Sequence, residues 1–186
     1  MPRQCPGATA RRRGDSPPVA SAYDVAIVTG GSRGPGRTIA RTLARRGYAV
    51  VVVYLRNQPE AEATVDEILA AGGTALAARA DVTDALDVER VFDETAAMFG
   101  GVDVVVHTAL RGTAVVYQRA AQQLQHGGAI VSVSSSDAIT PALAQELRRR
   151  DITVNGLAPG VEPPGAAHGA ADLVALLDRW RGRPGA

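Results

Sequence analysis

The sequence predicts an α/β domain built on a doubly wound parallel sheet of about six strands. Two observations lead to this prediction. From Tyr23 onward, short β-branched runs alternate with segments of helical period, and the first run leads directly into a glycine-rich turn that opens a helix. The apolar runs place the expected strands at residues 24–29, 49–54, 75–80, 102–107, 129–134 and 152–157.

Helices are expected between these strands because apolar residues recur at intervals of three and four positions. Since crossovers between parallel strands are nearly always right-handed, the units are expected to wind in two directions and to leave a crevice where the direction changes. The first three stripes are Gly36, Ile39, Ala40, Leu43, Ala44 and Gly47; Ala61, Val65, Ile68 and Leu69; and Val88, Val91, Phe92, Thr95, Ala96 and Phe99. A fourth, shortened helix is expected from Val115, Val116, Arg119, Ala120 and Leu124.

The glycine-rich turn carries the strongest functional signal. Residues 29–36 read Thr-Gly-Gly-Ser-Arg-Gly-Pro-Gly. Such a turn lets the backbone approach a pyrophosphate closely, and the N–H groups at the start of the next helix face the phosphate charge. The turn therefore predicts a Rossmann fold that binds a dinucleotide. The alternative is that Gly30, Gly34 and Gly36 serve only tight packing, but helix N–H groups without an acceptor favour an anion. Pro35 removes one such N–H, which is expected to weaken cofactor binding.

Charge and composition argue against several other classes of protein. The chain of 186 residues holds 20 basic and 19 acidic residues, a balance that does not favour a nucleic-acid partner. No segment approaches the roughly 18 unbroken apolar residues of a membrane helix. The single cysteine, Cys5, excludes a disulfide framework and is typical of a cytoplasmic protein. No metal site is expected, because His107, His126 and His168 do not share a ligand-like spacing.

The chain divides into three expected segments. Residues 1–22 carry arginines among proline, glycine and serine, with too little apolar surface to offset the entropy of ordering, and are predicted to form a disordered tail. An organelle-targeting peptide and an anion-binding arm are the alternatives for this tail. Residues 23–162 are expected to form the dinucleotide-binding domain, and residues 163–186 a short loop and helix.

Four segments in this order resemble the short-chain dehydrogenase/reductase family, and most of all its 3-oxoacyl-carrier-protein-reductase-like members. They are the glycine turn, Asp-Val-Thr-Asp at 81–84, the serine-ending strand at 128–135, and Ile-Thr-Val-Asn at 152–155 followed by Pro-Gly at 159–160. On its own, Asp81 would serve equally well as a helix cap. The resemblance implies cofactor contacts from Gly30, Ser32, Arg33, Gly34, Gly36, Asp81, Val82, Ala109, Pro159 and Gly160, and implies that Ser135 is the catalytic serine.

The end of the second expected strand favours NADP over NAD. An NAD site usually has an acidic residue about 20 positions after the glycine turn, where it bonds the ribose 2′-hydroxyl. Here the strand ends Tyr-Leu-Arg, and Arg56, with Arg33 from the turn, suits a 2′-phosphate. A solvated loop arginine is the alternative interpretation of Arg56. We therefore expect NADP as the cofactor, and NAD less so.

The catalytic residues that the resemblance implies are incomplete. In the family, a Tyr-xxx-Lys segment after the serine strand supplies the proton donor, but this chain contains no lysine. Its tyrosines are Tyr23, Tyr48, Tyr54 and Tyr117, all before the serine strand. The segment that bears Tyr and Lys is missing, so the domain is truncated relative to the family and Ser135 lacks its partners. In addition, His-Thr-Ala-Leu at 107–110 stands where relatives have Asn-Asn-Ala-Gly.

Two functions stay open from the sequence. The first is an NADP-dependent oxidoreductase that reduces a small-molecule carbonyl or ketoacyl substrate by hydride transfer, with its catalysis impaired. The second is a non-catalytic NADP-binding protein that acts as a sensor or partner subunit. The resemblance also leaves a homo-oligomer open.

Overall fold

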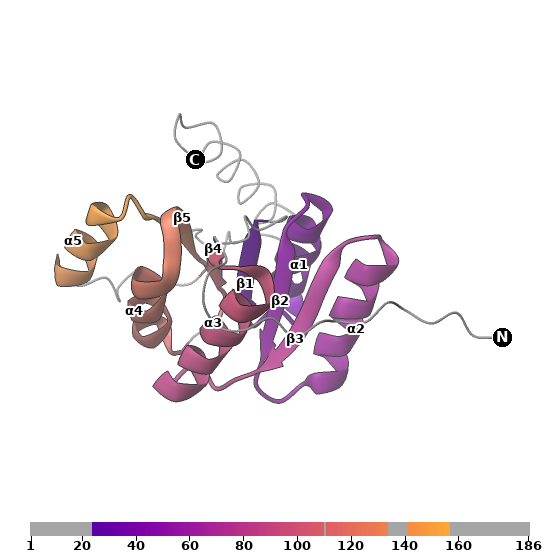
Figure 1. Ribbon diagram of the computed structural model, residues 1–186. Coiled ribbons are helices and arrows are strands. Elements are labelled where there is room, and N and C mark those ends of the chain that lie inside the picture. Colours follow the sequence, from indigo (N-terminus) through magenta and orange to yellow (C-terminus); the bar gives the residue numbers. More distant parts are fainter. Residues whose placement is uncertain (1–23, 110, 134–140, 157–186) are drawn as a thin grey trace, which may run out of the picture.

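The computed structural model describes residues 24–109, 111–133 and 141–156 of the chain (Figure 1). In these residues strands and helices alternate in the order β1 (Val25–Thr29), α1 (Gly34–Arg45), β2 (Ala49–Tyr54), α2 (Gln58–Ala70), β3 (Thr74–Arg79), α3 (Ala85–Phe99), β4 (Val102–His107), α4 (Thr113–Gln123), β5 (Leu124–Ser132), α5 (Pro141–Arg149) and β6 (Thr153–Gly156).

The strands form one parallel sheet in the order β3-β2-β1-β4-β5-β6. The chain first winds from β1 outward to β3, then crosses back through α3 to β4 and winds outward to β6. The direction therefore changes between β1 and β4, where a parallel α/β sheet has its crevice. This arrangement confirms the predicted doubly wound sheet of six strands.

Two apolar cores lie on the two faces of the sheet because successive strand residues point in opposite directions. In β1, Ala26 and Val28 pack against α1 and α2, while Ile27 lies in the core below α3 and α4. The last described helix, α5, joins this second core through Leu147. Figure 1 shows α3 and α4 in front of the sheet, with α1 and α2 grouped on the β2–β3 side. Both faces are thus covered, as the apolar character of the strands predicts.

The second helix differs from its predicted stripe at one position. Leu69 was expected in the core but is 49% exposed, whereas Thr64 is fully buried. Leu69 lies eight positions after Ala61, about 80° around the helix axis, so it falls at the edge of the buried face. Thr64 lies within that face, and its hydroxyl donates to the Glu60 carbonyl at 2.8 Å, so its burial leaves no unsatisfied donor.

The fifth strand begins earlier than predicted. It was expected at 129–134, but β5 starts at Leu124, which pairs with Val102 of β4, and the register shifts before Ala129 pairs with Val104. Gly127 lies within this irregular stretch at φ +82°, and its N–H donates to the Arg150 carbonyl at 3.0 Å. The shortened helix α4 therefore ends at Gln123, and the prediction that Leu124 belongs to this helix is wrong.

The predicted terminal segments, 1–22 and 163–186, lie outside the described residues, as do the ends of two expected strands, Ser134 and Leu157. Within the described part of the chain, no helix combines the length and the apolar character that crossing a bilayer requires.

Candidate dinucleotide site

The glycine turn between β1 and α1 is packed tightly against its neighbours. The N–H of Gly30 donates to the Val53 carbonyl at 3.0 Å, and Thr108 Oγ1 donates to the Thr29 carbonyl at 2.6 Å. A Cβ atom at Gly30 would lie 2.6 Å from that Thr108 oxygen, and a Cβ at Gly36 would overlap the Gly30 carbonyl. Only glycine fits these two positions, so part of the motif serves packing.

Gly34 lies in a different environment. Its φ is +53°, and an added Cβ would meet no atom within 4 Å. The space above this residue is therefore open, and close packing does not explain its lack of a side chain. Without a side chain at the start of a helix, the backbone N–H groups can be approached closely by a ligand. A pyrophosphate bound at a helix N-terminus needs such an approach.

The N-terminus of α1 begins at this open space without a side-chain cap. Its cap residue, Arg33, has a side chain with donors only, so it makes no side-chain cap bond to the helix N–H groups. The first turn of α1 also holds no acidic residue. By contrast, α3 is capped by Asp84, whose Oδ1 accepts from the N–H of Leu86 at 2.8 Å. The first N–H groups of α1 and its positive dipole end thus suit an external anion. Pro35 supplies no donor, as the sequence predicts.

Asp81 follows β3 at the same edge of the sheet and does not cap a helix. Its Oδ1 accepts from Thr83 Oγ1 at 2.7 Å and from the Thr83 N–H at 2.9 Å. These two bonds, the side-chain bond first, hold the pKa of Asp81 below its ordinary value, and nearby Arg56 acts in the same direction. Since Asp84 takes the capping role, the alternative interpretation of Asp81 loses its support. Asp81 is a charged acceptor held in a fixed turn.

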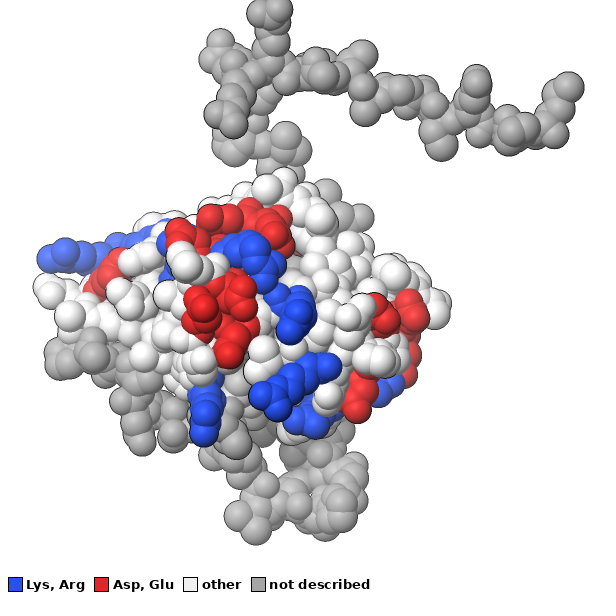
Figure 2. Space-filling view, turned by 90° about the horizontal axis from the view of Figure 1, so that it is seen from below, with Lys and Arg blue, Asp and Glu red and all other residues white. Residues whose placement is uncertain are grey.

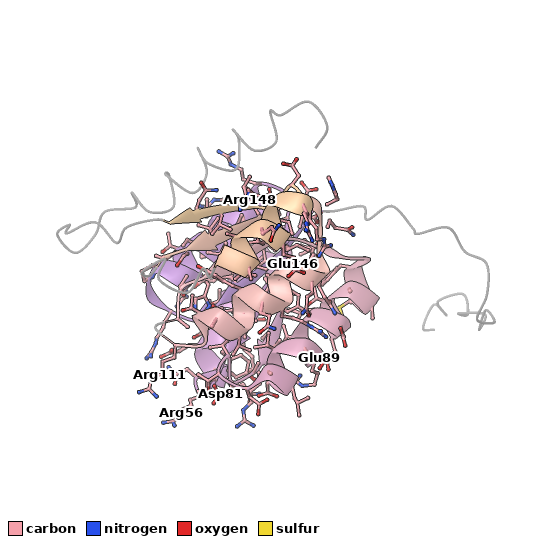
Figure 3. The ribbon with its side chains drawn as sticks, turned by 90° about the vertical axis from the view of Figure 1, so that its left-hand side faces the viewer. Arg56, Asp81, Glu89, Arg111, Glu146 and Arg148 are labelled. Carbon is pink, nitrogen blue, oxygen red and sulfur yellow. The ribbon has the colours of Figure 1, made fainter. Side chains whose placement is uncertain are left out.

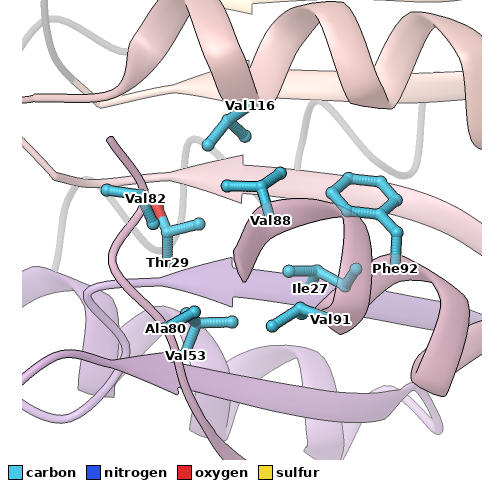
Figure 4. Close-up of a pocket in the computed structure, with 9 residues that line it drawn as sticks. All are labelled: Ile27, Thr29, Val53, Ala80, Val82, Val88, Val91, Phe92 and Val116. Atoms are coloured by element: carbon cyan, nitrogen blue, oxygen red, sulfur yellow. The ribbon is translucent and has the colours of Figure 1, made fainter. Parts of the chain in front are cut away.

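An apolar pocket lies beside Asp81, between the carboxyl ends of the strands and helices α3 and α4 (Figure 4). Its cavity volume is only about 10 Å³, roughly the room that one water molecule needs. Its walls combine strand ends, the segment after β3 and the inner faces of both helices: Ile27, Thr29, Val53, Ala80, Val82, Val88, Val91, Phe92 and Val116. The cavity is therefore a small gap in the apolar core under the edge, and the acceptor available at the surface beside it is the Asp81 carboxylate.

A buried histidine, whose bonds the sequence does not reveal, lies under this edge. His107 is fully buried; its Nδ1 lies 2.8 Å from Thr29 Oγ1 and its Nε2 lies 3.2 Å from Thr113 Oγ1. The ring packs edge-on against Tyr117 at a centroid distance of 6.0 Å. Burial lowers the pKa of His107 from 6.5 to about 4, and the Arg111 carbonyl opposes this shift. The neutral ring therefore ties β1 and β4 to the start of α4.

The predicted arginines are exposed at the same edge. Arg33 is the N-cap of α1, and Arg56 follows β2. Figure 3 shows Arg56 near Asp81, which agrees with the effect of this arginine on the Asp81 pKa. Ser32 is buried, and its carbonyl accepts from Thr64 Oγ1 at 3.3 Å, so its backbone anchors the turn on α2.

The structure brings most predicted site residues to one edge of the sheet. Gly30, Ser32, Arg33, Gly34 and Gly36 follow β1, Arg56 follows β2, Asp81 and Val82 follow β3, and Ala109 follows β4. The predicted residues Ser135, Pro159 and Gly160 lie outside the described residues.

Comparisons with known proteins agree with this geometry. A family model described as short chain dehydrogenase matches residues 24–124. The 3-oxoacyl-[acyl-carrier-protein] reductase FabG of Staphylococcus aureus (strain Mu50 / ATCC 700699) is 35% identical over 179 residues, 73% of each protein. Short chain dehydrogenase claC of Passalora fulva is 31% identical over 179 residues, 73% of this chain and 67% of that protein. A crystal structure of a short chain dehydrogenase from Burkholderia cenocepacia J2315 in complex with NADP has a TM-score of 0.70 at 31% identity, covering 83% of this chain and 88% of that one.

Proposed function

The chain belongs to the short-chain dehydrogenase family of oxidoreductases, and we propose on that premise that it binds NADP(H) at the carboxyl edge of its sheet. The observation that carries the proposal is the open space over Gly34 at the uncapped start of α1. The first N–H groups of α1 would hold the pyrophosphate. Asp81 and the adjoining segment at Val82 would contact the adenine.

The preference for NADP over NAD rests on the charge at the end of β2. The strand ends at Tyr54, and the next residues, Leu55 and Arg56, offer no carboxylate for a ribose 2′-hydroxyl. Arg56 and Arg33 offer guanidinium groups, which suit a phosphate. The Burkholderia relative in complex with NADP supports the same choice.

NADPH, when bound, supplies a hydride for the reduction of a small-molecule carbonyl, the reaction class of the 3-oxoacyl-carrier-protein reductases to which the chain is similar. For this reaction the chain must also pass a proton to the carbonyl oxygen. It has no lysine, so it cannot form the Tyr-xxx-Lys pair expected from the family. We propose that carbonyl reduction is impaired, because losing a positioned general acid typically costs about 10²- to 10⁴-fold in rate.

Two of the three tyrosines in the described residues, Tyr48 and Tyr117, are placed as a non-catalytic cofactor-binding role would allow. Tyr117 is fully buried against His107, and burial raises the pKa of its hydroxyl while Ser132 opposes this effect. Tyr48 is 1% exposed at the amino end of β2, opposite the cofactor edge. Neither hydroxyl is placed to reach a substrate above the carboxyl ends of the strands. This second function therefore stands beside impaired reduction.

A titration with NADPH followed by a turnover assay tests the proposal. We expect NADPH fluorescence to change on binding, and its absorbance to decay slowly or not at all when ketones and a 3-oxoacyl thioester are added. Slow decay above background supports impaired reduction, and binding without decay supports the non-catalytic role. Absence of binding contradicts the proposal, and decay at ordinary enzyme rates contradicts the loss of the proton donor.

Gly34→Ala provides a local test of the pyrophosphate position. An alanine at positive φ costs about 1 kcal/mol of stability. In addition, the new methyl group enters the open space over the turn, so we expect the Kd for NADPH to rise at least tenfold, a cost of about 1.4 kcal/mol. Calorimetric titration and urea unfolding measure the two effects.

Gly47→Ala is the matched control for this substitution. Gly47 also has a positive φ, +86°, and an open surrounding within 4 Å, but it lies beyond the far end of α1. We expect a similar loss of stability and an unchanged Kd. Equal effects of both variants on the Kd would place the pyrophosphate away from Gly34.

The cytoplasmic location, the homo-oligomer and the absence of a nucleic-acid partner stay predictions from the sequence.

A further inference from the structure

The short connection between β4 and α4 brings a further arginine to the cofactor edge. Gly112, at φ +78°, lies directly on the segment after β3: a Cβ there would be 2.5 Å from the Val82 carbonyl carbon. The residue before it, Arg111, is exposed. Because Val82 follows Asp81, this contact of Gly112 brings the neighbouring Arg111 to the proposed adenine site from the side of β4.

Arg111 and Arg56 approach this edge from two different loops. Arg56 follows β2 and lowers the pKa of Asp81, so it lies near that carboxylate. In the view of Figure 3, the labelled Arg111, Arg56 and Asp81 all lie toward the same lower corner of the molecule. Of the two, Arg56 lies near the Asp81 carboxylate, which is already bonded to Thr83.

Several arginines elsewhere in the described residues form ion pairs with carboxylates, whereas those at the cofactor edge do not. Arg37 is paired with Glu67, and Arg119 lies 2.6 Å from Glu89. Within the described ranges, no ion pair is found for Arg33, Arg56 or Arg111. Their charges are thus available to an external anion at the carboxyl edge of the sheet.

We propose that Arg111 is a specificity residue that contacts the 2′-phosphate of NADP(H) together with Arg56. The inference rests on the proposed function, and it adds a residue that the glycine turn and the end of β2 do not supply. A phosphate monoester carries close to two negative charges at neutral pH and several acceptor oxygens, so a second guanidinium gains further charge-assisted hydrogen bonds. The 2′-hydroxyl of NAD(H) offers no such charge.

The test compares two small probes that differ only in the 2′-phosphate, adenosine 2′,5′-bisphosphate and AMP. Calorimetric titrations use the full chain and the variants Arg111→Gln and Arg111→Lys. We expect Arg111→Gln to raise the Kd for the bisphosphate about tenfold and to leave the Kd for AMP within about twofold, as loss of one charge-assisted bond predicts. Arg111→Lys should recover part of the loss, since it keeps the charge but not the planar fork.

Arg148→Gln is the matched control. Arg148 is an exposed arginine in the last turn of α5, away from the corner that holds Arg111 and Arg56 (Figure 3). The Arg148→Gln substitution removes one positive charge, as Arg111→Gln does, and should leave the Kd values for the bisphosphate and for AMP unchanged. If Arg111→Gln weakens both probes equally or neither, while the unsubstituted chain binds NADPH, the assignment of Arg111 is overturned and the proposed function stands. If the unsubstituted chain binds neither NADPH nor the bisphosphate, the proposed function itself fails.

Discussion

Replacing Gly36 with alanine is expected to lower the free energy of unfolding by about 3 kcal/mol, the upper range for an overpacked site. The added Cβ would overlap the Gly30 carbonyl and approach the Gly30 carbonyl carbon at 2.8 Å and Thr108 Oγ1 at 3.0 Å. Backbone atoms cannot move aside as a flexible side chain can. The glycine turn must therefore separate from α1, and NADPH binding should be lost with it. Urea unfolding and NADPH titration measure both losses.

Helix propensity alone predicts the opposite sign. Alanine in place of glycine inside a helix is worth up to about 1 kcal/mol of stability. Thr38→Ala, an exposed substitution in the same helix, is the matched control: it removes a methyl group and a hydroxyl that donates to the Gly34 carbonyl at 3.4 Å. We expect it to change stability by about 0.5 kcal/mol or less. A gain of stability in Gly36→Ala would contradict the close contact between α1 and the turn.

Acidification is expected to destabilise the chain through His107. Its pKa is about 4 in the folded state against an ordinary 6.5, so between these values the unfolded chain binds a proton that the folded chain does not. Stability is therefore fully retained above pH 6.5 and falls as the pH drops towards 4. The loss from this residue is about 3 kcal/mol at 1.36 kcal/mol per pH unit. Urea unfolding between pH 7 and pH 4 measures it.

The variant His107→Asn isolates this contribution, since asparagine does not titrate and is the residue expected at this position from the family. It loses the bond to Thr29 and should be less stable at pH 7. Its decline between pH 6.5 and 4 should be about 3 kcal/mol smaller than that of the parent chain. His126→Asn, at an exposed position of β5, should leave the decline unchanged. Equal declines in the parent chain and His107→Asn would show that His107 is not buried in its neutral form.

Local patterns were sufficient to predict most of the fold. Strand β2 is a run of valines buried on both faces, and its boundaries were predicted correctly. The helix α1 buries Ile39, Ala40 and Leu43, which its periodicity indicates. Such patterns depend on neighbouring positions in the chain, so a sequence contains them directly. The start of β5 at Leu124 was missed because its partner, Val102 of β4, is not a neighbour in the sequence.

The candidate site was predicted in part for the same reason. The glycine turn, Arg56 and Asp81 each follow an apolar run, so the carboxyl edge of a parallel sheet gathers them. The roles of individual residues were harder to predict from the sequence. Asp81 and Asp84 are both possible caps in the sequence, and only the bonds to Thr83 and Leu86 assign the cap to Asp84.

By itself, the sequence determined that the sheet winds in two directions around a glycine turn and that no Tyr-xxx-Lys pair exists, because chain order and residue content do not depend on folding. Only the tertiary structure decided that Gly34 faces open space while Gly36 is packed, that Gly112, next to Arg111, lies against Val82, and that His107 is buried against Thr29, 78 positions away. The burial of a side chain, the space around a glycine and the distance between charges depend on contacts between distant segments. These contacts form only when the strands assemble into the sheet.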